Sequence, residues 1–274
     1  MYICGCVKNS GKYIDNVFNN ILEIIKLFNN YKVIVAYDES NDNTLNKLNE
    51  WQTKIPNVNI IFNNNKSSVR TENISNARNS IINFINNDND NHNYEYFIMM
   101  DFDDVCSKNI DTSIIQKYVN RSDWDCVSFN RTNYYDIWAL SFDLYKGSCF
   151  QFDHTPSNGN EVVTIMKTEI TEKLRNMDKN ELLEVYSAFN GFAIYRTNKF
   201  INCRYSHLVS DNFKFISREN YNEIINILNN SGKLTRTIDW NNRPSDCEHR
   251  HFHFEANYKN NAKICISPLI IFKE

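Results

Sequence analysis

The sequence predicts an α/β fold with a mainly parallel central sheet that is flanked by helices. Two observations support this prediction. Short apolar runs rich in β-branched residues alternate with amphipathic helical patterns four times in the first half of the chain, which is typical of strand–helix–strand units with parallel strands. No segment rich in proline and glycine interrupts the chain. We therefore expect one domain over 1–274, with a regular half (1–106) and a mixed α+β half (107–274).

Each element of the regular half follows from a local pattern. In the helix over 12–28, apolar residues recur at helical spacing. The run "YKVIVAY" (31–37) is rich in β-branched residues, as buried strands are. Ser40 or Asp42 is expected to cap the helix that ends at Trp51. The expected strands cover 1–7, 31–37, 58–62 and 94–100. The expected helices cover 12–28, the segment that ends at Trp51, and 74–85, with a polar loop over 86–93.

The second half alternates less regularly. An apolar pattern predicts a strand in "WDCVSFN" (124–130), and aromatic-rich turns follow it to residue 153. Further helices are expected over 110–119, 161–176 and 219–230, and further strands over 185–195 and 263–272. We therefore expect this half to mix helices and strands without a strict repeat.

Composition excludes several classes of protein. The chain has 274 residues, a net charge of −3 and 42% hydrophobic residues, which is typical of a globular protein. It has no surplus of lysine and arginine to neutralise a nucleic-acid backbone, so no nucleic-acid partner is expected. No apolar run is long enough to span a bilayer, and no basic segment followed by an apolar stretch opens the chain. We expect a cytoplasmic protein, or a catalytic domain separated from its anchor, with reduced and mostly buried cysteines.

Three carboxylates directly follow the apolar run at 97–100. Asp101, Asp103 and Asp104 lie at the carboxyl end of a buried strand, where like charges raise one another's pKa. One interpretation is a site for a hard divalent cation, Mn²⁺ or Mg²⁺, which takes oxygen ligands. The other is helix capping, which we expect for Asp104 or Asp111 in either case.

Two further polar segments belong to the same edge of the predicted sheet. "YDESNDNT" (37–44) follows another strand end, where ligands of parallel sheets bind. "RTENISNARN" (70–79) places Arg70 and Arg78 between the two acidic segments, where a diphosphate or a base needs donors. Each also has a simpler interpretation, in which Asp38 forms a turn and Arg78 lies on a helix surface.

The order of these segments resembles the nucleotide-sugar half of a GT-A-type glycosyltransferase. The order is a strand, "D-x-S-x-D-x-T", a helix with "ARN", a second strand and "D-x-D". The resemblance covers 1–106 and implies a GT-A-like, Rossmann-type sheet. It implies that Asp38 contacts the nucleoside and that Arg78 flanks the donor. It further implies that Asp101 and Asp103 hold the donor diphosphate through Mn²⁺ or Mg²⁺.

Three segments of the second half extend the resemblance. "YYDIWALSFD" (134–143), "SAFNGFAIYR" (187–196) and "DCEHRHFHF" (246–254) occur in the order seen in fungal capsule-type mannosyltransferases and their relatives. We treat these segments as an indication of a subgroup within the wider glycosyltransferase family.

The histidines of the last segment are candidate metal ligands. If 248–254 is extended, His249, His251 and His253 share one face of a strand, opposite to Glu248. The resemblance implies that a histidine near the C-terminus completes the metal shell, with His249 as first choice and His251 as second. A separate zinc site on all three histidines, or surface histidines on an edge strand, are the alternatives.

Carboxylates in the same region are candidates for the general base. Glu248 is the first candidate for deprotonating an acceptor hydroxyl, with Asp246 and Asp143 as alternatives. Such a base implies inversion at the anomeric carbon.

Aromatic residues of the second half have two interpretations. Tyr134, Tyr135 and Trp138 either stack on an acceptor sugar or belong to the core. Gly191 either lets backbone approach a sugar or forms an ordinary turn.

We therefore predict a metal-dependent hexosyltransferase. It moves a sugar from a nucleotide-diphosphate donor to a hydroxyl group of a glycan, glycoconjugate or protein. The alternatives are a nucleotidyltransferase acting on sugar phosphates and a non-catalytic glycan-binding relative. The first needs a glycine-rich phosphate loop after the first strand, where this chain offers only Gly5 and Gly11 beside Lys8 and Lys12.

Overall fold

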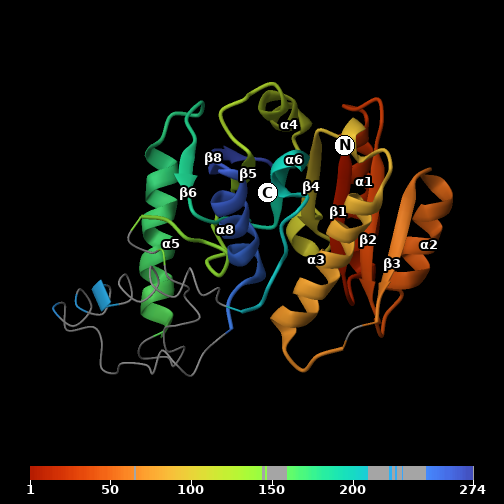
Figure 1. The fold of residues 1–274 in the computed structure, drawn as a ribbon, viewed down its shortest axis with the longest axis horizontal. Coiled ribbons are helices and arrows are strands. Elements are labelled where there is room, and N and C mark those ends of the chain that lie inside the picture. The colour runs from red at the N-terminus through yellow and green to blue at the C-terminus, as the bar shows by residue number, and fades with distance from the viewer. Residues whose placement is uncertain are drawn as a thin grey trace.

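The strands of the protein form one mixed sheet. A computed structural model describes residues 1–64, 66–143, 159–208 and 245–273, with isolated positions at 146, 222, 223, 226 and 230. The strands are β1 (Tyr2–Val7), β2 (Lys32–Asp38), β3 (Val58–Asn63), β4 (Tyr96–Asp101), β5 (Cys126–Asn130), β6 (Leu183–Val185), β7 (Phe192–Arg196) and β8 (Ile264–Ile270). Within this described part the sheet has the order β3-β2-β1-β4-β7-β5-β8-β6. Figure 1 shows β3 and β6 at its two ends.

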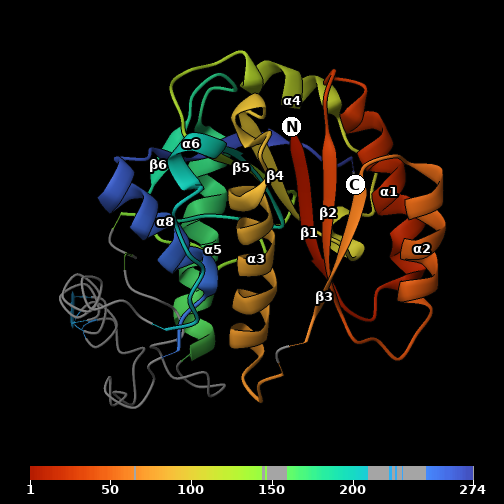
Figure 2. The same cartoon turned by 45° about the vertical axis from the view of Figure 1, so that its right-hand side comes forward.

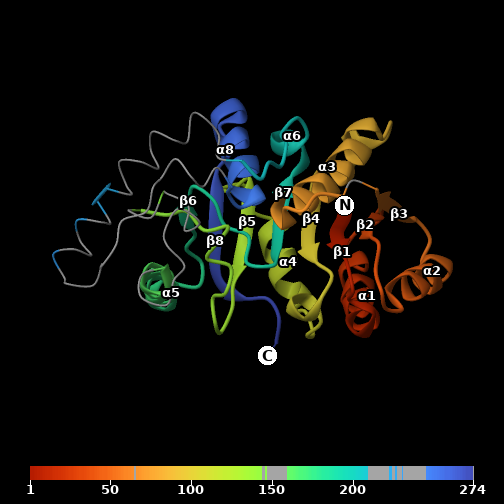
Figure 3. The same ribbon diagram turned by 90° about the horizontal axis from the view of Figure 1, so that it is seen from below.

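Helices cover both faces of the sheet. They are α1 (Gly11–Ile25), α2 (Thr44–Lys54), α3 (Arg70–Asn87), α4 (Thr112–Val119), α5 (Gly159–Asn176), α6 (Thr197–Phe200) and α8 (Glu248–Asn260), with 3₁₀ turns η1 (Asn91–Asn93) and η2 (Asp104–Cys106). Apolar residues of α1, α2 and α4 share one core, and those of α3, α6 and α8 share another. Figure 3 shows α3, α6 and α8 on the opposite side of the sheet from α1 and α4. In Figure 2, α3 lies in front of the sheet and α1 and α2 lie to its right.

Alternation along the strands produces these two cores. In β1, Tyr2 and Cys4 pack into the core under α3, whereas Ile3 and Val7 pack into the core under α1. Successive side chains of a strand point to opposite faces, so a strand buried on both sides is apolar throughout. The two-sided burial explains why the strand sequences are continuous apolar runs.

The first half confirms the predicted parallel arrangement. β1 pairs in parallel with β2 and β4, and β2 pairs in parallel with β3. The carboxyl ends of these strands therefore meet at one edge of the sheet. Asp101 lies opposite Cys6 across the β1–β4 pair, and Asp38 lies opposite Asn63 across the β2–β3 pair.

The second half is mixed, as expected, but two predicted elements were wrong. β7 is antiparallel to both β4 and β5, while β5 and β8 are parallel. The strand expected over 185–195 is two strands, because Asn190 (φ 54°) and Gly191 (φ 83°) turn the chain between them. The segment 248–254, considered as an extended strand, is the first half of α8. The expected helix over 219–230 lies largely outside the described residues, as do the turns from 144 to 153 apart from residue 146.

Capping side chains fix the ends of several helices. Asp111 accepts a hydrogen bond from Ser113 N at the start of α4, as predicted. Asp103, rather than Asp104, caps the turn η2 by accepting from Val105 N. At the start of α2 it is Asp42, rather than Ser40, that accepts from the first-turn Thr44 N at 3.0 Å.

Two findings on the described residues bear on the composition of the chain. Among them, no helix is long and apolar enough to cross a membrane. The cysteines described there carry free thiols, and all but Cys6 are buried.

Candidate active site

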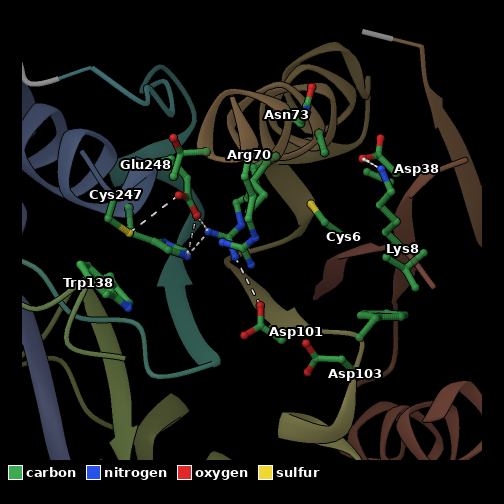
Figure 4. A pocket seen from close by; sticks show the side chains of 18 of the residues that line it. Cys6, Lys8, Asp38, Arg70, Asn73, Asp101, Asp103, Trp138, Cys247 and Glu248 are labelled. Atoms are coloured by element: carbon green, nitrogen blue, oxygen red, sulfur yellow. Dashed lines mark hydrogen bonds and ion pairs between the residues drawn. The ribbon is translucent and has the colours of Figure 1, made fainter. Parts of the chain in front are cut away.

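A cleft of about 990 Å³ opens at the carboxyl ends of β1, β2 and β4. The side chains around it come from both halves of the chain (Figure 4). The predicted site residues that line it are Asp38, Arg70, Arg78, Asp101, Asp103, Glu248 and His249. The structure therefore brings together most of the candidates, while Asp246 and His251 are not among the lining residues.

Asp101 and Asp103 leave the sheet at the end of β4. The Asp101 backbone N–H donates to Gly191 O at 2.9 Å, which continues the β4–β7 pairing. Its side chain accepts from Tyr135 Oη at 2.9 Å and from Arg78 Nη2 at 3.3 Å. Asp103 has one oxygen bonded to Val105 N at 3.0 Å. Both carboxylates are thus held in place, and both line the cleft.

These two carboxylates fit a hard divalent cation. Burial raises the pKa of Asp101, and burial together with the charge of Asp101 raises the pKa of Asp103 to about 7. A cation would offset both effects, because it favours the charged form of each acid. Among the described residues no three histidine, cysteine or acidic side chains converge into a ready metal cage. Mg²⁺ and similar cations commonly use one or two carboxylates and take the remaining ligands from phosphates and water.

Arg78 joins the two halves of the cleft. It lies in α3, is buried, and pairs through Nη1 with both Glu248 Oε1 and His249 Nε2, while Nη2 reaches Asp101. Its guanidinium lies 4.8 Å from the ring centre of Phe189. A buried charge is tolerated only when it is paired and hydrogen-bonded. The simpler expectation, a surface residue of the helix, is therefore wrong for Arg78.

His249 is held as a neutral ring. It stacks on Phe189 at 3.8 Å between ring centres. Burial first, and then the charge of Arg78, lower its pKa well below the usual value. Because a guanidinium can only donate, Nε2 is the acceptor and the proton lies on Nδ1. That Nδ1 atom is buried and has no hydrogen-bond partner within the described structure.

The helical conformation of α8 separates the three histidines that an extended strand would have aligned. His253 lies one turn after His249 and is fully buried, with its ring bonded to Ser187 Oγ at 2.8 Å and Tyr195 Oη at 3.1 Å. His251 lies between them on another face of the helix, away from the cleft. A zinc site on all three is therefore wrong, as is the alternative of an edge strand with surface histidines.

The alternative base candidates have other partners. Asp246 is buried and forms an ion pair with Arg250 Nε at 3.0 Å, which fixes the start of α8. Asp143 pairs with Lys173 on α5. Neither lines the cleft.

Asp38 lies at the other end of the cleft, at the end of β2. Its Oδ1 accepts from Asn63 Nδ2 at 2.8 Å, and Lys8 Nζ lies 3.8 Å from its Oδ2. A smaller hollow of about 370 Å³ adjoins it, and all its lining residues have polar side chains. The lining residues are Lys8, Asp38, Glu39, Asn41, Asn63, Lys66, Ser67 and Asn73. Arg70, exposed at the start of α3, forms part of the wall of the larger cleft.

Asp136 is a further carboxylate of the cleft that was not among the candidates from the sequence. Its carboxylate lines the cleft and accepts from Ala139 N and Asn190 N, each at 3.2 Å. Burial, and then the charge of Asp101, raise its pKa to about 7. A signal was present, because Asp136 is a second carboxylate of the aromatic segment 134–143, of which only Asp143 had been a candidate for the base.

The aromatic residues of that segment divide between core and cleft. Tyr134 is fully buried, so its assignment to a sugar platform is wrong. Tyr135 and Trp138 both line the cleft and are each more than a third exposed. Gly191 serves a packing role, since a Cβ there would lie 2.4 Å from Val105 Cγ1.

Comparison with known proteins supplies the family. The model described as glycosyl transferase family 2 matches residues 2–203. No curated protein sequence matches the chain.

Solved structures with a similar arrangement include three bacterial and archaeal proteins. One is the mannosyltransferase PcManGT from Pyrobaculum calidifontis in complex with GDP-Man and Mn²⁺, at 11% identity and a TM-score of 0.47, over 81% of this chain and 51% of that one. Another is TarS 1–349 from S. aureus, at 14% identity and a TM-score of 0.42, over 80% of this chain and 54% of that one. A third is glucosyl-3-phosphoglycerate synthase from Mycobacterium tuberculosis in complex with Mn²⁺, UDP and glucosyl-3-phosphoglycerate. It has 10% identity and a TM-score of 0.40, over 73% of this chain and 57% of that one. This chain spans about half the length of these structures.

Proposed function

Because this chain belongs to glycosyl transferase family 2, we propose that it transfers a sugar from a nucleotide-diphosphate donor to a hydroxyl group. The observation that carries the proposal is the convergence of Asp38, Arg78, Asp101 and Asp103 on one cleft at the carboxyl edge of the parallel strands. That edge is where ligands of such sheets bind.

The nucleoside belongs at the Asp38 end of the cleft. Asp38, Asn63 and Asn73 there offer one carboxylate and two side-chain amides, which suit the mixed donors and acceptors of a base and a ribose. Lys8 and Arg70 also line the larger cleft, and their cationic groups suit a diphosphate.

The diphosphate belongs beside Asp101 and Asp103, and these two carboxylates would hold Mn²⁺ or Mg²⁺ there. When bound, the cation supplies electrostatic stabilisation of the negative charge that grows on the leaving diphosphate. Asp103 has one oxygen free of the η2 cap, whereas both oxygens of Asp101 accept bonds from Arg78 and Tyr135. His249 can serve as a further ligand through Nε2 only after Arg78 withdraws from it.

The acceptor hydroxyl, of a glycan, glycoconjugate or protein, is deprotonated by a carboxylate of the second half, in a single displacement that inverts the anomeric carbon. Glu248 is the candidate proposed from the sequence. It lines the cleft at the start of α8, where α8 faces α3.

Two features argue against a nucleotidyltransferase. Such an enzyme needs glycines after β1 whose backbone cradles phosphate. Here a Cβ on Gly5 would lie 2.1 Å from the Phe102 ring, and one on Gly11 would lie 1.9 Å from Asn43 Oδ1. Both glycines therefore serve close packing between elements.

Calorimetric titration with UDP and GDP, with and without Mn²⁺, tests the donor site. We expect one of the two nucleotides to bind at least tenfold more tightly with Mn²⁺, because Asp103 would hold the cation in the cleft that takes the diphosphate. Asp103→Asn should abolish this difference. Asp104→Asn is the matched control, since Asp104 is exposed and outside the cleft lining.

Absence of metal-dependent nucleotide binding in the unaltered protein would contradict the proposal. Metal-dependent binding without turnover of any nucleotide sugar would instead indicate a non-catalytic relative that retains the fold.

A further inference from the structure

The turn that follows β5 places a carboxylate and an aromatic ring at the end of the cleft away from Asp38. Asp136 and Trp138 both line the cleft, and Trp138 is 37% exposed. Figure 4 shows Trp138 on the opposite side from Asp38 and Lys8, with Asp101 between them. If the nucleoside occupies the Asp38 end, this opposite end is where the acceptor enters.

Asp136 is held rigidly. Its carboxylate accepts from the backbone N–H groups of Ala139 and Asn190. Asn190 in turn accepts from the N–H groups of Tyr135 and Asp136 at 3.3 and 3.4 Å and donates to Phe129 O at 3.0 Å. A catalytic group must be positioned within a fraction of an ångström, and this network supplies that positioning.

The partners of Asp136 distinguish it from the other carboxylates of the second half. Glu248 is paired with Arg78, and Asp246 is paired with Arg250. Within the described residues, Asp136 bonds only to neutral N–H groups. A carboxylate whose negative charge is not paired with a cation is the better proton acceptor. The raised pKa of Asp136, with Asp101 and Glu248 as its acidic neighbours and Arg78 as its basic one, agrees with that role.

The charges around the cleft restrict the acceptor. The cationic side chains among its described lining residues are Lys8, Arg70 and Arg78, which come from the loop after β1 and from α3. Arg78 is already bonded to two carboxylates. At the acceptor end, Asp136 lies near the carboxylates of Asp101 and Glu248. The charge of Arg131 also acts on Asp101, but this guanidinium is buried, donates to Asn190 O and Val105 O, and is not among the described lining residues. A phosphorylated or carboxylated acceptor would meet repulsion there, whereas an uncharged one would not.

We propose that the acceptor is an uncharged saccharide, which stacks one ring face on Trp138 and gives the proton of its reacting hydroxyl to Asp136. The acceptor oxygen forms a bond to the anomeric carbon of the donor sugar. The anomeric C–O bond to the diphosphate breaks, and its electron pair leaves with the nucleoside diphosphate. The proton ends on Asp136. This inference rests on the proposed glycosyltransferase function and assigns the acceptor class and the base within it.

The experiment measures donor binding and sugar transfer separately. The donor is the nucleotide sugar that binds most tightly with Mn²⁺, and the acceptors are neutral methyl pyranosides and disaccharides together with their sugar-phosphate counterparts. We expect transfer to at least one neutral saccharide and none to the phosphates. Asp136→Asn should lower kcat by about 10²- to 10⁴-fold, with the donor Kd unchanged within about twofold. Trp138→Ala should raise the acceptor KM by about tenfold with a smaller effect on kcat.

Matched variants keep the test decisive. Tyr258→Ala removes a ring that is 79% exposed on α8 and outside the cleft lining, and it should leave all constants unchanged. If Asp136→Asn does not fold, as judged by its melting temperature, Asp136→Glu replaces it. That variant keeps the charge but moves the carboxylate, and it should lower kcat at least tenfold.

Three results would overturn the inference. They are a loss of less than tenfold on either Asp136 substitution, a preference for phosphorylated acceptors, or donor hydrolysis without transfer to any neutral saccharide. Each leaves donor binding intact. Absence of donor binding in the unaltered protein would instead refute the proposed function itself.

Discussion

Arg78 connects residues that lie far apart in the sequence. It is bonded to Asp101 from β4 and to Glu248 and His249 from α8. The local pattern "ARN" indicates a helix but says nothing about a partner 170 positions away. The contacts with Asp101, Glu248 and His249 explain the burial of Arg78, because a guanidinium leaves water only where acceptors replace its hydration.

Removal of either Arg78 or Glu248 alone should lower the free energy of unfolding more than removal of both charges together. We expect Arg78→Met to lower the free energy of unfolding by about 3–5 kcal/mol, because it leaves Glu248 as an uncompensated buried charge. Arg78→Met combined with Glu248→Gln should recover part of that loss. Urea unfolding of the two single variants and the double variant measures the coupling between the sites.

Additive effects in this cycle would show that the pair contributes no coupling energy to folding. Lys26→Met is a suitable control, since Lys26 pairs with Glu23 on the surface, where an ion pair contributes little.

At the scale of elements, the first turns of α1 and α2 are joined by one side chain. Asp42 accepts from Thr44 N in α2 and from Gly11 N at 2.9 Å in α1. Ser10 N also donates to Thr44 Oγ1 at 2.8 Å. The acidic segment after β2 therefore has two roles. Asp38 faces the cleft, and Asp42 fixes the helix ends that border it.

Asp42→Ala should lower the free energy of unfolding by about 1–2 kcal/mol, as loss of a capping side chain does. The effect should lie at the upper end of this range, because two helix starts lose an acceptor. Ser40→Ala is the matched control and should cost less, since Ser40 accepts only from Asn9 N and does not contact α2. Equal losses for the two variants in thermal or urea unfolding would show that Asp42 does not act as a shared cap.

The segment 248–254 forms the start of the helix α8 rather than the expected extended strand, and this difference has the largest effect on the site. In a strand, Glu248 and His249 would point to opposite faces. In the first turn of a helix, both contact Arg78. The apolar pattern of "CEHRHFHF" gives little help, because Phe252 and His253 are both buried and the helix is polar on average. Packing of α8 on α3 and α6, rather than periodicity, decides the conformation.

At the scale of the whole molecule, buried histidines make stability depend on pH. His253 lies between α8 and the sheet, and burial lowers its pKa to about 3. In the unfolded chain a histidine titrates near 6.5, so the unfolded state binds a proton that the folded state refuses. The contribution of the neutral His253 ring to the free energy of unfolding is therefore complete above about pH 6.5 and is lost as the pH falls toward 3.

Comparison with His253→Gln isolates this contribution. We expect the free energy of unfolding of the unaltered protein to fall relative to the variant by up to about 1.4 kcal/mol per pH unit between about 6.5 and 4.5. Asp103 and Asp136, with raised pKa values, act in the opposite direction, but they are common to both proteins and cancel in the difference. Parallel pH profiles of the two proteins would contradict the assignment.

Local sequence determined the first half of the molecule. Four strands and their helices follow from residues that are neighbours in the chain, because a strand buried on both faces must be apolar throughout and an amphipathic helix must repeat every 3.6 residues. The parallel order then places every carboxyl end at one edge. Asp38, Asp101 and Asp103 were consequently found from the sequence, since their place in the cleft depends only on which strand each one ends.

The tertiary structure alone decided which charges are paired. Two of these contacts join segments that lie far apart in the sequence, namely Arg78 with Glu248 and Asp136 with the turn at Asn190. The third, between Arg250 and Asp246, depends on the helix α8, which periodicity did not reveal. A carboxylate acts as a base, a cap or half of an ion pair according to the groups that surround it, and those groups come together only when the chain has folded. For this reason the sequence determined where the Asp38 end of the cleft lies, whereas only the fold distinguished Asp136 from the other acids of the second half.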